Sequence, residues 1–156
     1  MNLAAAMICV VALALGAEKP LDKPVTVHVH AIQATNEGRP KGEIHVDPKI
    51  ASLKDAVSKV PCDTFKPILS EKVEAKPDTE TSVKVNERYT IVLTPIAVDD
   101  DGRVRIRVRI DETVKKGEET VTRKALESTN LIRDDKPLVL GGLHLDEGQL
   151  AVVVEL

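Results

Sequence analysis

Residues 103–110 have the sequence Arg-Val-Arg-Ile-Arg-Val-Arg-Ile, and this stretch decides the fold class. Successive side chains of a β-strand point to opposite faces, so a period of two separates two kinds of residue. One face carries four arginines, and the other carries Val104, Ile106, Val108 and Ile110. A sheet with one apolar face and one charged face packs against a core on one side and meets water on the other. The stretch therefore predicts a β-sheet protein.

The segments around this strand predict an antiparallel meander over residues 88–156. An acidic turn ending in glycine, residues 99–102, joins a strand at 88–98 to the arginine strand, and a turn at 115–119 leads to a strand at 120–129. Residues 138–145 and 150–156 form a closing hairpin. Proline cannot donate a hydrogen bond to a sheet, so Pro95 indicates an edge or a bulge. The pair Gly141-Gly142 lacks a Walker pattern and a following helix, so it indicates strand geometry instead of a phosphate loop.

The N-terminal half adds strands and one helix. Residues 25–35 alternate between apolar and polar side chains, and residues 64–75 and 79–85 are also expected to be extended. Asp47-Pro48 is a typical helix start, and the apolar residues that follow recur at three- and four-residue steps up to Pro61. The predicted fold is α+β and β-rich, a mostly antiparallel sheet or sandwich with one short amphipathic helix.

Composition predicts one domain, residues 25–156, with an aliphatic core. Tryptophan is absent, and Phe65 and Tyr89 are the only other aromatic residues apart from histidines. The net charge of -3 and the absence of a long basic run argue against nucleic-acid binding. One cysteine, Cys62, lies in that domain, so no internal disulfide is expected, and a small buried side chain is favoured over a bond between subunits.

Residues 1–17 resemble a secretory signal peptide, with an apolar stretch at 7–15 and small residues before a cleavage point near Ala17. A retained membrane anchor is the alternative, although the stretch is shorter than the roughly 20 residues that span a bilayer. Residues 18–24 are then a polar leader. These features predict a secreted or periplasmic protein of a bacterial envelope, with no membrane span after cleavage.

The sequence contains no motif for a catalytic site, so we expect a protein that is not an enzyme and has no cofactor. His28 and His30 are weak candidates for metal binding, because residues two apart on a strand share a face. A site would need a third ligand, either His45, His144 or a carboxylate brought in by the fold. The acidic run at 99–101 does not have the spacing of an EF-hand, so a hairpin tip is expected there.

The arginine face is the candidate for partner binding, through Arg103, Arg105, Arg107 and Arg109. Arginines in a row repel one another unless acids on neighbouring strands balance them. One hypothesis is a solvated face paired with acids such as Glu118, Glu119, Glu127 or Glu87. The other is a docking surface for an acidic partner or an anionic envelope polymer.

Residues 88–156 resemble the last part of the conserved domain of secretins, the outer-membrane gates of type II and III secretion and of type IV pili. The shared features run in order along the chain: Leu93-Thr94-Pro95, Asp101-Gly102, Asp111-Glu112, Ser128-Thr129-Asn130 and Asp135 to Leu143, which ends in Gly-Gly-Leu. The resemblance implies a secretin-like β-module in the wall of an envelope assembly. The chain is too short for the membrane hairpins, gate and ring domains of a secretin.

Two main functions follow from these observations, and a hydrolase whose site assembles only in three dimensions is a third hypothesis. The first is an envelope protein that acts through contacts with other proteins, in a homo-oligomer or a larger assembly. The alternative is a monomeric periplasmic protein that binds a small ligand or a metal, with His28 and His30 as the binding face.

Overall fold

The computed structural model describes residues 18–156, so the predicted signal segment 1–17 lies outside the described residues. The described chain forms two five-stranded sheets. This confirms the β-rich α+β prediction. Sheet A runs in the order β1-β6-β7-β8, with β5 beside β6, and its strands are β1 (Lys19–Pro20), β5 (Thr81–Lys84), β6 (Tyr89–Val98), β7 (Val104–Lys116) and β8 (Glu119–Ile132). Sheet B runs in the order β3-β4-β2-β10-β9, with β3 (His45–Val46), β4 (Thr64–Ala75), β2 (Val25–Thr35), β10 (Gln149–Glu155) and β9 (Leu138–His144).

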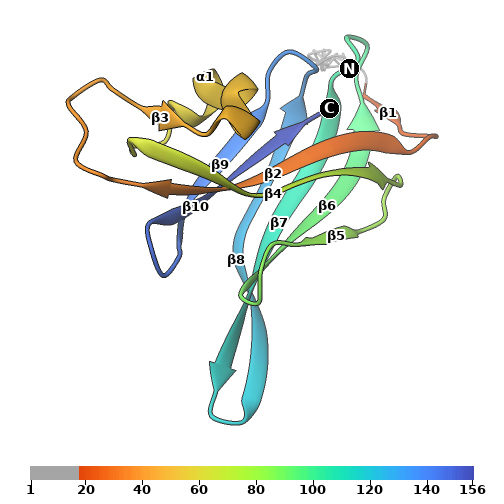
Figure 1. Cartoon of the computed structure of the whole chain (residues 1–156). Helices are drawn as coiled ribbons and strands as arrows, with labels where there is room; N and C mark the ends of the chain where they lie inside the picture. The colour runs from red at the N-terminus through yellow and green to blue at the C-terminus, as the bar shows by residue number, and fades with distance from the viewer. Residues whose placement is uncertain (1–17) are drawn as a thin grey trace, which may run out of the picture.

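The two sheets pack face to face, and their long strands cross (Figure 1). The core between them is aliphatic, as composition predicts: it combines Val27, Val29 and Val152 of sheet B with the apolar face of β7 from sheet A. All four apolar residues of that face are buried, and the arginines lie on the opposite face. Tyr89 is also buried and donates a hydrogen bond from its hydroxyl to the carbonyl of His144, 2.7 Å away, so it joins the two sheets.

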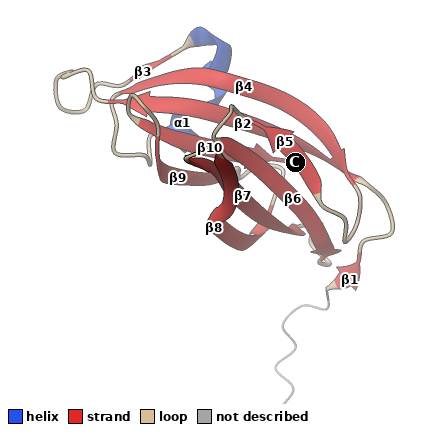
Figure 2. Cartoon of the chain, turned by 90° about the horizontal axis from the view of Figure 1, so that it is seen from below, coloured by secondary structure: helices blue, strands red, loops and turns tan. Residues whose placement is uncertain are grey.

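A second, smaller core covers part of the outer face of sheet B. It places Ile50, Leu53 and Val57 of the helical segment against Ile32 and Val153 of the sheet. Figure 2 shows the helical segment on the side of sheet B that faces away from β6 and β7. Sheet B is therefore apolar on both faces beneath the helical segment. Beyond that segment, its outer face is polar.

The helical segment is shorter than the sequence predicts. It consists of the 3-10 helix η1 (Pro48–Leu53) and the single turn α1 (Lys54–Val57). The start is as expected, because the carboxylate of Asp47 accepts a hydrogen bond from the amide of Lys49 at 2.9 Å. The expected apolar stripe is buried, but Ile50 has non-helical backbone angles, φ -121° and ψ 23°. The apolar side chains of the segment pack against sheet B, although the backbone at Ile50 departs from a regular helix.

Both predicted irregularities of the strands are bulges. The register between β6 and β7 shifts between Pro95 and Ala97. The register between β9 and β10 shifts at the glycine pair, where Gly142 has a φ of +91°. The predicted leader also differs from the expectation, because Lys19–Pro20 pairs with Ala97 and Val98 of β6 and so belongs to sheet A. No helix within residues 18–156 has the length and apolar character needed to cross a membrane.

Candidate metal centre

Three potential metal ligands converge on the polar part of the outer face of sheet B. Val27 and Val29 of β2 point into the main core, so the residues between and after them, His28 and His30, point outward. The antiparallel register places Glu155 of β10 directly opposite His28. Two neighbouring strands, from opposite ends of the described chain, thus bring two imidazoles and a carboxylate together.

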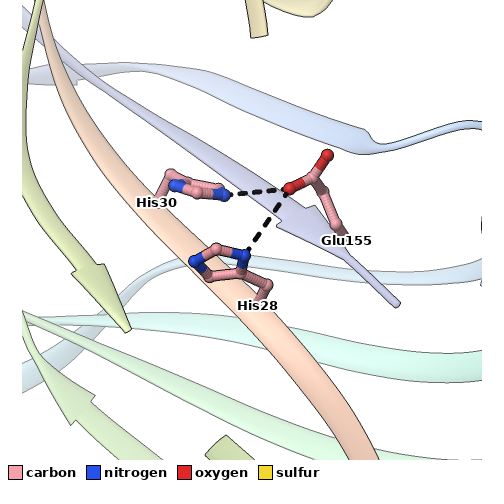
Figure 3. A group of neighbouring side chains, drawn as sticks. All are labelled: His28, His30 and Glu155. Carbon is pink, nitrogen blue, oxygen red and sulfur yellow. Dashed lines mark hydrogen bonds and ion pairs between the residues drawn. The ribbon is translucent and has the colours of Figure 1, made fainter. Parts of the chain in front are cut away.

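Figure 3 shows both rings directed at the same carboxylate oxygen of Glu155. Nε2 of His30 lies 2.9 Å from Oε2, and Nδ1 of His28 lies 3.9 Å from it. The two ring centroids are 4.0 Å apart, and the rings are tilted by 43°. One ligand atom from each residue lies within 4.8 Å of the other two. Ligands of a tetrahedral zinc ion, each about 2.0–2.2 Å from the metal, lie about 3.3 Å apart, so small side-chain rotations would complete the geometry.

His30 is held firmly, whereas the other two ligands are accessible. The residue is 6% exposed, and its Nδ1 lies 2.8 Å from the hydroxyl of Ser70 on β4. The side chains of His28 and Glu155 are about one-third exposed. A hydroxyl can donate or accept, so Ser70 can serve His30 in either tautomer. When Nε2 hydrogen-bonds to Glu155, Ser70 donates to Nδ1, and when Nε2 binds a metal, Nδ1 donates to Ser70.

The surroundings of His28 favour its neutral form. Burial lowers the pKa of His28, and the neighbouring His30 and Lys72 lower it further, while Glu155 raises it. Lys72 lies opposite His28 on β4. A neutral imidazole keeps the lone pair that a metal requires. Nitrogen and carboxylate ligands of this kind suit zinc, copper, nickel and iron ions better than calcium or magnesium.

The sequence predicted two of the three residues in this cluster. The spacing of His28 and His30 placed them on one face, but the identity of the third ligand depends on the pairing of β2 with β10. The other two histidines do not join the cluster. His45 is exposed on β3, and His144 is exposed on β9, where its carbonyl accepts the hydrogen bond from Tyr89.

The arginine face lies elsewhere, on the outer side of sheet A, and acids balance most of it. Arg103 lies 2.6 Å from Asp99, and Arg109 lies 2.8 Å from Glu80 and 2.9 Å from Asp111. Arg105 pairs with Glu18. Within residues 18–156, Arg107 is exposed and has no acid within ion-pair distance.

Two of the acids that the sequence suggested as partners of the arginines pair with lysines instead. Glu87 pairs with Lys84, and Glu127 pairs with Lys124, although the register places Glu127 opposite Arg109. The actual partners of the arginines come from the leader, from the segment before β5, from the turn at residues 99–102 and from β7 itself. The turn at residues 99–102 is a hairpin tip in which the carboxylate of Asp99 accepts hydrogen bonds from the amides of Asp101 and Arg103.

No protein-family model matches the chain, and no curated protein or solved structure shows significant similarity to it. The resemblance to secretins therefore remains a prediction from the motifs.

Proposed function

We propose that this protein binds a divalent transition-metal ion of the zinc class through His28, His30 and Glu155. The observation that carries the proposal is the convergence of two imidazole nitrogens and a carboxylate oxygen within 4.8 Å. Three protein ligands leave one position of a four-coordinate ion for water or a small ligand. This is the metal-binding alternative that the sequence offered.

The supporting evidence goes beyond proximity. One ligand is buried and oriented by a hydroxyl, and in metal sites such a partner fixes the ring and its tautomer. The pKa of a second ligand is lowered, which keeps its nitrogen available near neutral pH. The docking of an acidic partner on the arginine face is the less supported function, because three of the four arginines already have acidic partners.

The test is calorimetric titration of the full chain with zinc chloride near neutral pH. We expect one ion per chain. His28→Ala and Glu155→Gln change accessible side chains, so both variants should keep the fold. Loss of a group that only supports a ligand weakens metal binding by about 10- to 100-fold. Loss of a ligand itself should therefore weaken zinc binding by roughly 10-fold or more. His45→Ala and His144→Ala are matched controls that remove exposed histidines outside the cluster. Unchanged affinity in both cluster variants, or loss of affinity in a control, would refute the proposal.

Ser70→Ala tests the role of the supporting hydroxyl. It removes the partner of His30 Nδ1 without touching a ligand, so we expect zinc binding to weaken by about 10-fold, with the stoichiometry unchanged. Ser82→Ala, on the exposed face of β5, is the matched control and should bind zinc like the unmodified protein. Equal affinities in the two serine variants would mean that the hydroxyl does not orient the ring.

A further inference from the structure

The outer edge of β8 is the longest free sheet edge in the part of the chain that the structure describes. β8 has 14 residues, and its neighbour in sheet A is β7. The other free edges are shorter: β1 and β3 have two residues, β5 has four, β9 has seven, and β4 has ten residues, 66–75, beyond its pairing with β3. A long free edge presents unpaired amide and carbonyl groups that can pair with a further strand. Val121 and Leu131, two of the exposed large apolar residues, also lie on β8.

We infer that β8 pairs in antiparallel fashion with β8 of a second copy of this chain, so that two copies share one continuous sheet. A two-fold axis relates the copies in such a pair, and the same strand must therefore complement itself. The inference rests on that self-complementarity and is independent of the metal centre.

A bulge in β8 sets the register of this pairing. The register between β7 and β8 shifts between Ile110 and Asp111, whose partners are Leu126 and Lys124, so Ala125 is the extra residue. In this pairing Ala125 is again the extra residue and has no partner, as it has none in β7. When Leu126 lies opposite its own copy on the axis, Lys124 therefore lies opposite Glu127. The same register places Thr122 opposite Thr129. Symmetry repeats each of these pairs, so the interface contains two Lys124–Glu127 pairs.

The side chains of these pairs lie on the same face of the sheet. Lys124 lies opposite Asp111 of β7, and Glu127 lies opposite Arg109. Arg109 and Asp111 share a face, because their side chains form an ion pair at 2.9 Å. Lys124 and Glu127 are already 3.6 Å apart within one chain. The second copy would complete a square of two lysines and two glutamates of alternating sign.

Charge also excludes the neighbouring registers. A slip of two residues in one direction places Lys124 opposite Lys124 of the second copy, and the opposite slip places Glu127 opposite Glu127. Like charges directly across a strand pair are destabilising. A slip of one residue would turn each side chain toward the wrong face. Charged residues often keep edge strands apart, but here their order along β8 matches a second β8 in one register.

Charge reversal tests the inference by sedimentation equilibrium of the full chain, with a chelator present so that metal cannot bridge two copies. We expect a monomer–dimer equilibrium. Lys124→Glu or Glu127→Lys alone should weaken the dimer roughly tenfold, because each change creates two like-charged pairs. The double variant should restore it. Lys84→Glu and Glu87→Lys are the matched controls and should leave the dimer unchanged, because this exposed pair has the same spacing but lies at the end of β5 and in the turn that follows it.

Hydrogen exchange at low and high protein concentration provides a second measurement. We expect amides within residues 119–132 to exchange more slowly at high concentration, and amides of β9 to be unaffected. A monomer at every concentration, a dimer that the single reversals do not weaken, or slower exchange confined to β9 or β3 would overturn the inference.

Discussion

Glu112 is a buried charge that the fold retains at the base of the β7–β8 hairpin. The residue is 5% exposed, and its two oxygens accept hydrogen bonds from different arginines. Nε of Arg88 lies 2.7 Å from Oε1, and Nε of Arg123 lies 3.0 Å from Oε2. Burying a carboxylate is costly unless such partners are present. The two arginines remain partly exposed, so their charges stay solvated.

These contacts give a prediction for the effect of pH on stability. Hydrogen bonds from Arg88 and then Arg123 lower the pKa of Glu112 from its ordinary value of 4.5. The unfolded chain therefore takes up a proton at a higher pH than the folded chain does, and Glu112 stabilises the fold above its unfolded pKa. This contribution should be lost as the pH falls from about 4.5 through the lower folded pKa.

The measurement is the free energy of unfolding in urea from about pH 6 to about pH 3, for the unmodified protein and Glu112→Gln. We expect the variant to be less stable by about 1–3 kcal/mol at the upper end, since hydrogen bonds to a charged group are lost. The difference should shrink as the pH falls. A constant difference would show that the charge of Glu112 is not the cause. Glu87→Gln, an almost fully exposed acid, should change stability by less than about 0.5 kcal/mol.

Among elements, the turn between β9 and β10 contains the glycine of residues 18–156 that leaves least room for a side chain. Gly148 has a φ of +75°, and a Cβ atom built on it would lie 2.2 Å from the carbonyl oxygen of Ala34. This contact fixes the start of β10 against the end of β2, where Gln149 pairs with Ala34. The register of the whole strand pair follows from it, including the placement of Glu155 opposite His28.

Gly148→Ala should therefore destabilise the protein by roughly 2 kcal/mol or more, since it adds a backbone clash to an unfavourable φ. Gly117→Ala is the matched control: its φ is +64°, but nothing lies within 4 Å of the added carbon. The control should cost about 1 kcal/mol. Thermal unfolding of both variants checks the difference, and equal losses would show that the contact with Ala34 relaxes at no cost.

The elements also show what the sequence could predict. The eight longer strands were predictable because each carries an alternating pattern or lies between turn residues, whereas the two-residue strands β1 and β3 carry no such pattern and were not predicted. The helical segment was predicted too long, because three- and four-residue spacing reports which side chains are buried and not whether the backbone is regular, as Ile50 shows. The bulges at Pro95 and at Gly141-Gly142 were predictable from residue types, whereas the one at Ala125 has no such marker.

For the whole molecule, the candidate metal centre brings together the two ends of the described chain. His30 and Glu155 are 125 positions apart, and no local pattern indicates that they meet. The histidine pair was therefore predictable and the third ligand was not. The same limit applies to the arginine face, whose partner Glu18 comes from the predicted leader.

A bound ion should stabilise this arrangement as a whole. If the folded chain alone binds zinc, a free zinc concentration about 100 times the Kd should raise the free energy of unfolding by about 2.7 kcal/mol. Urea unfolding with and without zinc measures the effect, and adding a chelator should reverse it. Glu155→Gln, which we expect to bind zinc roughly 10-fold more weakly or worse, should gain about 1.4 kcal/mol or less at the same zinc concentration. Equal stabilisation of the variant would place the ion elsewhere.

The position of β10 inside sheet B, between β2 and β9, has a consequence for the order of folding. Strands β5 to β8 follow one another and pair through short turns, so sheet A can form while the chain is still being synthesised. Sheet B stays incomplete until residues 149–155 have emerged, because β2 and β9 have no direct pairing. The histidines of β2 therefore meet Glu155 only once β10 has paired with β2, so a metal ion held by all three residues would bind after sheet B has formed.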